Sequence, residues 1–207
     1  MNKNTRDIEL SVELDASPED VFRAVTDGTE IAKWLAPEAR EGGKTTLRLV
    51  HSGFSASADW DDEYEAHKRG WKLMLQNLRQ YFARHAHEPA VHLPLMSNVE
   101  SPRGSIWKTL LRTLGFSGPP RQSDPFRFTT PNGSVLTGVV DLVTETRVLA
   151  LVVREYDDAL LRFTLEGKAD APSTFVYAYA IVFGAARERA SELVTAASSA
   201  ISTSSRS

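Results

Sequence analysis

The feature that most constrains the fold is a pattern that occurs twice, over residues 8–20 and again over residues 91–103. In each copy, apolar residues alternate with polar ones, and a Ser-Pro dipeptide follows, at Ser17-Pro18 and at Ser101-Pro102. Alternation of period two predicts a half-buried strand, and serine before proline predicts the first turn of a helix. The chain is therefore expected to hold two units that each open with a strand and a helix.

Both units are also predicted to close with a strand and a long helix. In the first, a strand over residues 45–50 precedes a helix that reaches about His85, with an apolar face of Trp71, Leu75, Leu78 and Phe82. In the second, five strands (around residues 126–128, then 135–143, 148–153, 160–166 and 175–183) precede a helix from about Ala185. An additional short helix is expected near residues 31–35. The predicted class is α+β, with helices on one face of an antiparallel sheet.

Composition restricts the function classes. The apolar fraction of 42% and the charged fraction of 25% are ordinary for a globular protein. Without cysteine, disulfides and thiolate metal sites are excluded. Residues 1–88 carry 12 basic and 16 acidic side chains, and neither half has the basic stripe typical of nucleic-acid binding. The N-terminus lacks a secretory apolar core, and no apolar run is long enough to span a membrane, so a cytoplasmic protein without membrane or nucleic-acid partners is expected.

Two segments of the first unit resemble a known family. IELSVELDASPEDVFRAVTDGTEIAKWLAP, and TTLRLVHSGF followed by GWKLMLQNLRQYF, are similar to the opening and closing segments of the activator-of-Hsp90-ATPase-like branch of the START-like (Bet v 1-like, SRPBCC) superfamily. Residues 89–201 resemble a second, divergent unit in pattern only. The resemblance implies a helix-grip fold, in which a curved antiparallel sheet wraps a long C-terminal helix. It also implies that the first unit, residues 1–87, lacks its middle strands, so that its first and last strands, over residues 8–14 and 45–50, are expected to pair. Residues 202–207 are expected to form a flexible tail.

Histidines and acids offer weak candidates for chemistry. His85-x-His87 could supply two metal ligands, but a closed site needs a full ligand set, so no metal and no cofactor are expected. His51, at a strand end, more simply satisfies a local hydrogen bond. The acids at residues 59–65 precede a helix, where negative charge favours the helix dipole, and the chain shows no nucleophile elbow, phosphate loop or dinucleotide fingerprint. No catalytic residue is therefore assigned.

The leading functional hypothesis, which the family resemblance implies, is a binding module for a small hydrophobic or amphipathic molecule in the second unit. Aromatic and small residues alternate over residues 175–183, which suggests either a filled core or a cavity beside the terminal helix. The predicted lining residues are Trp107, Phe163, Phe175, Tyr177, Tyr179 and Leu193. The alternatives are a co-chaperone-like or regulatory interaction domain without a small ligand and, less favoured, a cyclase- or hydrolase-type enzyme. Loss of the middle strands also predicts self-association through the strand edges of the first unit.

Overall fold

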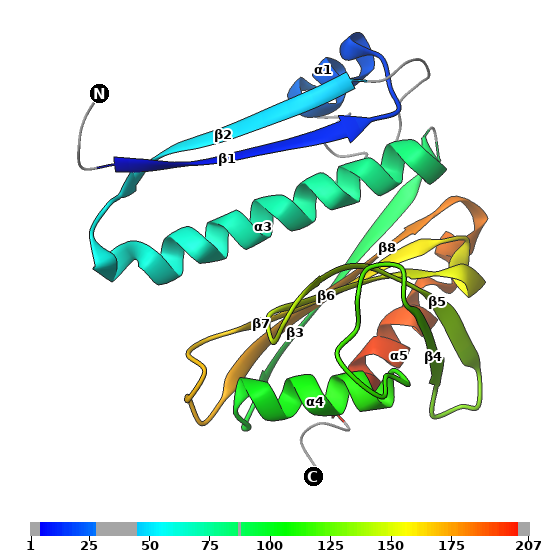
Figure 1. The fold of residues 1–207 in the computed structure, drawn as a ribbon. Coiled ribbons are helices and arrows are strands. Elements are labelled where there is room, and N and C mark those ends of the chain that lie inside the picture. Colours follow the sequence, from blue (N-terminus) through cyan, green and yellow to red (C-terminus); the bar gives the residue numbers. More distant parts are fainter. Residues whose placement is uncertain (1–4, 28–44, 87, 203–207) are drawn as a thin grey trace. The chain divides into compact units, whose positions relative to one another are not determined.

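The computed structural model describes residues 5–27, 45–86 and 88–202 (Figure 1). The chain divides into two compact units, Met1–Glu88 and Pro89–Ser207. The helix predicted near residues 31–35 lies outside the described residues. None of the described helices is both long and apolar enough to cross a membrane.

The first unit pairs two strands and packs one long helix against them. The antiparallel strands are β1 (Thr5–Leu14) and β2 (Thr45–Ser55). Between them lies α1 (Pro18–Thr26), and after β2 a short 3₁₀ turn (Ala58–Trp60) leads into α3 (Asp61–Gln80) and a π turn (Tyr81–His85). The predicted pairing of residues 8–14 with 45–50 is confirmed, because Leu10 lies opposite Leu49 and Val12 opposite Leu47.

The two Ser-Pro helix starts differ in the structure. Ser17 caps α1 as predicted, because its hydroxyl accepts a hydrogen bond from the backbone N–H of Asp20 at 3.1 Å. In the second copy, α4 (Arg103–Thr113) begins one residue later, with Pro102 at the N-cap and no side-chain capping bond. Ser101 instead offers its carbonyl to the hydroxyl of Thr174, at 2.9 Å, which ties the start of α4 to the sheet.

Local packing explains the histidines and acids of the first unit. The Trp71 indole N–H donates to Nδ1 of His51 at 2.9 Å, the local hydrogen bond expected for that histidine. Acids occupy the first turn of α3, and Asp61 pairs with Arg6 at 2.7 Å. His85 Nδ1 lies 3.1 Å from Glu88, and its predicted companion at position 87 is outside the described residues. Within the described ranges, no group of three or more His, Asp or Glu side chains is arranged to hold a metal ion.

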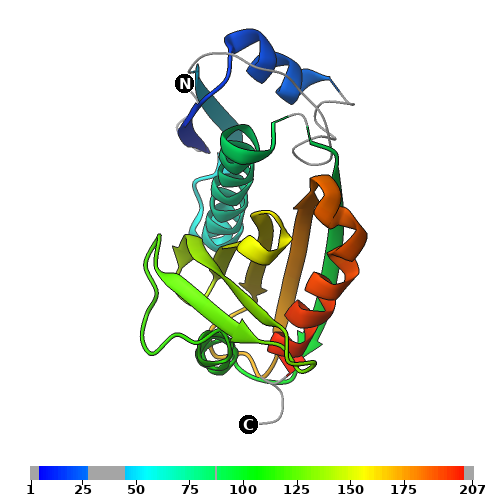
Figure 2. The ribbon, with the colours of Figure 1, turned by 90° about the vertical axis from the view of Figure 1, so that its right-hand side faces the viewer.

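The second unit is a six-stranded antiparallel sheet with a terminal helix, in the order β3-β8-β7-β6-β5-β4. The strands are β3 (Ala90–Val99), β4 (Pro125–Thr129), β5 (Val135–Thr144), β6 (Val148–Val153), β7 (Ala159–Glu166) and β8 (Thr174–Phe183). The terminal helix α5 (Ala190–Ser202) packs against β3 and β8 and lies beside them in Figure 2. First and last strands are neighbours, and a long C-terminal helix lies on the sheet, so the predicted α+β class and helix-grip arrangement are confirmed for this unit.

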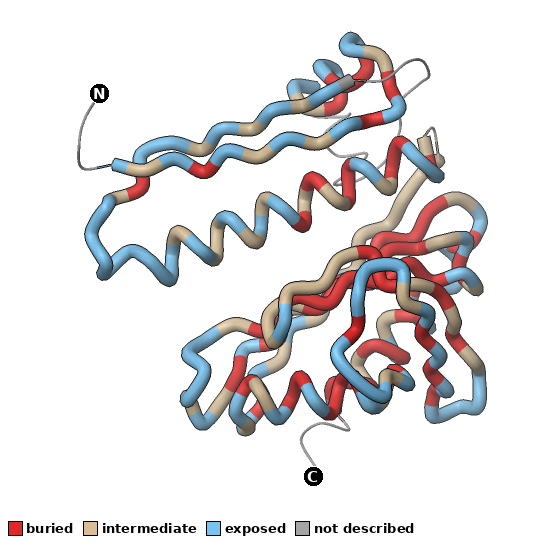
Figure 3. Tube along the Cα trace, viewed as in Figure 1, coloured by how far each residue is buried: buried red, intermediate tan, exposed pale blue. Residues whose placement is uncertain are grey.

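One face of this sheet forms the main core with α4 and α5. Val176, Ala178 and Ala180 of β8 point into it, and Trp107 and Leu193 reach it from the two helices. Burial of this apolar surface is the main source of stability for such a layer. Figure 3 shows the contrast between the units: β6 is buried throughout, whereas β1 alternates mainly between exposed and intermediate positions.

The opposite face of the sheet carries buried apolar residues and a buried ion pair. Leu160 and Ile181 lie opposite one another there and are buried. Arg162 is fully buried and donates to the carboxylate of Asp141 at 2.6 Å and to the Leu151 carbonyl at 2.8 Å. A register shift between residues 140 and 142 of β5 accompanies the placement of Asp141 on this face.

Candidate functional site

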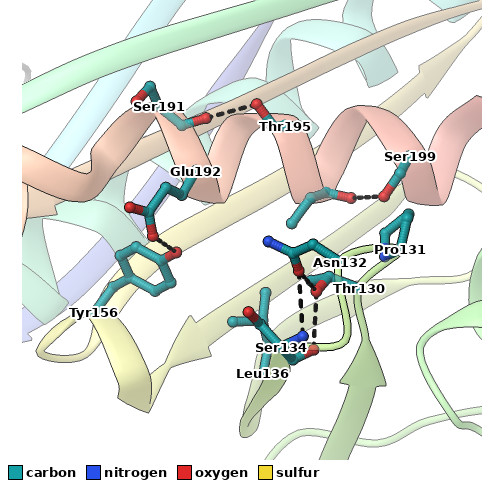
Figure 4. A pocket seen from close by; sticks show the side chains of 11 residues that line it. Thr130, Pro131, Asn132, Ser134, Leu136, Tyr156, Ser191, Glu192, Thr195 and Ser199 are labelled. Carbon is teal, nitrogen blue, oxygen red and sulfur yellow. Dashed lines mark hydrogen bonds between the residues drawn. The ribbon is translucent and has the colours of Figure 1, made fainter.

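A pocket of about 280 Å³ opens in the second unit between α5 and the turn that joins β4 to β5 (Figure 4). We call it the α5 pocket. Three parts of the chain line it: the β4–β5 turn with the start of β5, the end of the 3₁₀ turn (Arg154–Tyr156) between β6 and β7, and one side of α5. The lining residues are Thr130, Pro131, Asn132, Ser134, Leu136, Tyr156, Ser191, Glu192, Thr195, Ala196 and Ser199.

The floor of the α5 pocket is the edge of the hydrophobic core. Leu136, Tyr156 and Ala196 each line the pocket and belong to the core cluster, with at most 5% of their surface exposed. The rim is polar, because Ser191, Glu192 and Thr195 of α5 are exposed. A ligand in this pocket would therefore meet an apolar surface at its base and oxygen atoms at its mouth.

The β4–β5 turn holds its own conformation through internal hydrogen bonds. The Thr130 hydroxyl donates to the Ser134 carbonyl at 2.9 Å, and the side-chain oxygen of Asn132 accepts from the Ser134 backbone N–H at 3.2 Å. Gly133 adopts φ +87°, a conformation that favours glycine. Because the side-chain oxygen of Asn132 accepts a hydrogen bond within the turn, the amide nitrogen points away from the turn. Figure 4 shows this nitrogen on the side of α5.

A tyrosine–glutamate pair occupies the opposite wall. The Tyr156 hydroxyl donates to Oε2 of Glu192 at 3.1 Å, and the Arg189 guanidinium lies 4.7 Å from the centre of the Tyr156 ring. Burial, together with the hydrogen bond to Glu192 and its negative charge, raises the pKa of Tyr156 to about 12. The phenol therefore stays protonated at neutral pH and donates to Glu192.

The residues behind Tyr156 are fixed by a second carboxylate. Glu155 accepts from the backbone N–H of Thr137 at 2.7 Å and from its hydroxyl at 2.6 Å, and the Glu155 carbonyl accepts from Arg189 at 2.7 Å. Burial raises the pKa of Glu155, but the hydrogen bonds from Thr137 and the charge of Arg154 outweigh it and leave that pKa below its ordinary value. These contacts orient the Tyr156 segment towards α5.

The hydrogen-bond directions around the pocket define what it can recognise. Tyr156 donates its proton to Glu192, and Thr195 donates its own to the Ser191 carbonyl at 2.9 Å. Both hydroxyl protons therefore take part in hydrogen bonds within the protein, whereas the lone pairs of the two hydroxyl oxygens remain available to accept a hydrogen bond from a ligand. With the Glu192 carboxylate beside them, this wall favours a ligand that donates hydrogen bonds, such as an amine or a hydroxyl group.

The six residues predicted from the sequence to line a cavity are divided between the two faces of the sheet. Trp107, Phe163 and Leu193 lie in the core between the sheet and the helices. Tyr179 lies opposite the buried Arg162, on the other face, and Phe175 and Tyr177 share that face with it. Alternation along a strand separates two faces but does not say which of them meets the helix. None of the six lines the α5 pocket, and a ligand contact for them stays a prediction.

The residues that do line the pocket left a fainter signal in the sequence. Ser191, Thr195 and Ser199 recur every four residues, which places three hydroxyl groups on one stripe of the terminal helix. The dipeptide Asn132-Gly133 is a signal for a hairpin turn, and the aspartate pair after Tyr156 is typical of a turn, so neither indicates a binding site. Polar residues in turns and on exposed helix faces are common, so the pattern alone could not mark a site.

Comparison with known proteins gives structural likenesses of low identity. No family profile matches the sequence, and no curated protein matches it. The di-domain ARO/CYC BexL from the BE-7585A biosynthetic pathway is 12% identical, with a TM-score of 0.45, over 98% of this chain and 99% of that one. The Aha1 dimer from Colwellia psychrerythraea is 12% identical, with a TM-score of 0.43, over 56% of this chain and 93% of that one.

A third similar structure is protein MLL2253 from Mesorhizobium loti, at 15% identity and a TM-score of 0.42, over 55% of this chain and 93% of that one. Sequence identities and TM-scores this low do not indicate a shared activity. The helix-grip fold of the second unit therefore rests on its own strand order and terminal helix.

Proposed function

We propose that the second unit binds a small amphipathic molecule in the α5 pocket. The observation that carries the proposal is the combination of an apolar floor with a polar rim. Leu136 and Ala196 offer apolar surface from the edge of the core, and Glu192 offers a carboxylate at the mouth. Ligand pockets commonly combine apolar lining with a few placed polar groups in volumes of about 300–1,000 Å³. A volume of about 280 Å³ suits a small molecule or one end of a longer one.

The α5 side of the rim favours a ligand with a hydrogen-bond donor next to an apolar body, and the Asn132 amide on the other side can donate to an acceptor of the same ligand. An ammonium or hydroxyl group would lie against Glu192 and Thr195, and an aliphatic or aromatic part would cover the floor. Native mass spectrometry of the full chain, purified from its own host, would show whether such a molecule co-purifies with the protein. A dansyl-labelled alkylamine provides a direct probe, because its fluorescence rises in an apolar pocket.

Filling the pocket from its rim is expected to abolish binding of the probe. Thr195 is exposed and lines the pocket, so Thr195→Trp places an indole into the space without disturbing the core. We expect at least a tenfold loss of affinity in a fluorescence titration of the full chain. The matched control is Ala185→Trp, at an exposed position of the same unit that does not line the pocket. Equal binding by both variants and the wild type would place the site elsewhere.

Neutralising the carboxylate is expected to weaken binding selectively. Glu192→Gln keeps the size and the hydrogen bond to Tyr156 but removes the charge that attracts an ammonium group. Because Glu192 is exposed and screened by solvent, the expected loss for the dansyl alkylamine is about three- to tenfold. A dansyl alkyl alcohol of the same length should lose less than twofold. Equal losses for both probes would contradict the role assigned to the charge.

Self-association through the strand edges of the first unit stays a prediction, and so does an interaction role without a small ligand. Analytical ultracentrifugation of the full chain over a range of concentrations would test the first of these.

A further inference from the structure

A groove of about 510 Å³ lies within the first unit, between β1 and α3. We call it the β1–α3 groove. On one side it is lined by consecutive residues of β1, and on the other by one stripe of α3. The lining residues are Leu10, Ser11, Val12, Glu13, Lys68, Lys72, Leu75, Gln76 and Arg79.

The strand side of the groove presents main chain as well as side chains. Successive side chains of a strand point to opposite faces of the sheet, so a groove on one face would be lined by every second residue. The four consecutive residues from Leu10 to Glu13 all line this groove. The groove therefore runs along the edge of the sheet, where the backbone of β1 is exposed to it. In the sheet formed by the described residues, β1 pairs with β2 alone, so its other edge offers unpaired N–H and C=O groups. Towards the N-terminus, Tyr64 already donates to the Asp7 carbonyl at 3.1 Å, so the available edge begins after Asp7.

The helix side of the groove is basic. Lys68, Lys72 and Arg79 are exposed and follow one another at intervals of four and seven residues, which places them on one stripe of α3. Glu13 is the single acidic residue among those lining the groove. Lys68 also lies 3.7 Å from Glu65, a contact between two exposed groups that solvent screens. Leu75 is 6% exposed and gives the groove an apolar base between the cations.

The spacing of the two lysines matches that of alternate residues in an added strand. At a rise of about 1.5 Å per residue, Lys68 and Lys72 are about 6 Å apart along the helix, and Lys72 and Arg79 about 10 Å. Alternate residues of a strand are about 6.6 Å apart. A strand beside β1 with acids at alternate positions would therefore present two carboxylates at an interval close to that of Lys68 and Lys72, and Arg79 would add positive charge further along the groove.

We propose that the β1–α3 groove binds an extended acidic segment of a partner protein, which adds to β1 as a third strand. Main-chain hydrogen bonds to the strand edge would give affinity, and the cations of α3 would select acidic side chains, the division of roles found in other strand-addition complexes. Charge alone would also attract a nucleic acid, but the unpaired edge favours a polypeptide. A second copy of this chain is the other candidate, and the experiment distinguishes it.

The probe is a fluorescein-labelled peptide, Glu-Val-Glu-Thr-Glu-Val-Glu, titrated with the full chain in a fluorescence polarisation assay. Two matched peptides accompany it: one with lysine in place of every glutamate, and one with alternate backbone amides N-methylated. We expect the acidic peptide to bind, the lysine peptide not to bind, and the N-methylated peptide to bind at least tenfold more weakly. Equal affinity for the N-methylated peptide would overturn strand addition, because charge does not depend on amide protons.

The variant that tests the cations is the double substitution Lys68→Glu and Lys72→Glu. Both positions are exposed, so we expect the variant to fold as the wild type does. It is expected to weaken binding at least tenfold, whereas Lys108→Glu, at an exposed position of α4, serves as the matched control and should leave binding unchanged. Circular dichroism would confirm that both variants are folded. Unchanged affinity in the double variant, no binding by the wild type, or a stable dimer that the peptide cannot dissociate would each overturn the proposal.

Discussion

Replacing Asp141 by alanine is expected to lower the free energy of unfolding by about 3–5 kcal/mol, which is the usual cost of leaving one member of a buried ion pair without its partner. Arg162 has no exposed surface and Asp141 is 3% exposed, so water cannot take the place of the lost carboxylate. The hydrogen bond from Arg162 to the Leu151 carbonyl remains, but a neutral carbonyl stabilises the guanidinium charge less than a carboxylate does. The midpoint of urea unfolding, followed by circular dichroism, measures the effect.

The control for this prediction replaces both members of the pair. Asp141→Leu with Arg162→Met exchanges the ion pair for apolar side chains, which is often neutral or stabilising in a protein interior. We expect the double variant to recover most of the stability that Asp141→Ala loses. A loss below about 1 kcal/mol in Asp141→Ala would show that the guanidinium finds water or another acceptor, and that the ion pair contributes little to stability.

Replacing Gly138 by alanine is the second substitution with a large expected effect. A Cβ atom at this position would lie 1.8 Å from the Val152 carbonyl oxygen and 2.7 Å from Cε1 of Phe126. The first of these atoms belongs to the backbone of β6, so β5 and β6 would have to separate. Overpacking in a core commonly costs about 1–3 kcal/mol, and a clash with backbone belongs at or beyond the upper end of that range.

A glycine in open space provides the matched control. A Cβ atom on Gly104, in α4, would meet nothing within 4 Å. Gly104→Ala is therefore expected to stabilise the chain by about 0.5–1 kcal/mol, because alanine loses less conformational freedom than glycine in a helix. Thermal unfolding followed by circular dichroism should move in opposite directions for the two variants. A stable Gly138→Ala variant would mean that β5 and β6 can shift apart without losing their pairing.

Local periodicity accounts for the parts of the fold that could be predicted. The alternation around Leu10 and Val12 is a property of a few neighbouring residues, and it defines β1 whatever lies elsewhere in the chain. The same holds for the apolar stripe of α3 and for β6, where predicted and observed bounds agree. The pairing of β1 with β2 followed from the family resemblance, which relates segments far apart in the sequence.

The site could not be predicted in the same way, because it depends on which face of a strand meets which helix. The aromatic residues of β8 are more conspicuous than Val176 and Ala178, yet it is the smaller residues that face α5. Small side chains let a helix approach a sheet closely, and this preference emerges only when both elements are placed together. The Arg162–Asp141 ion pair depends on the register shift in β5, which the local sequence pattern does not predict.

The β4–β5 turn has a consequence for how this protein can diversify. Its hydrogen bonds run from Thr130 to Ser134 and from Ser134 to Asn132, so contacts within the turn hold its conformation. Pro131 is exposed and borders the α5 pocket. Exchanges at that position would reshape the pocket mouth while the strands keep their packing. Selection, natural or in the laboratory, could therefore explore new ligands at this rim without first having to find compensating mutations in the core.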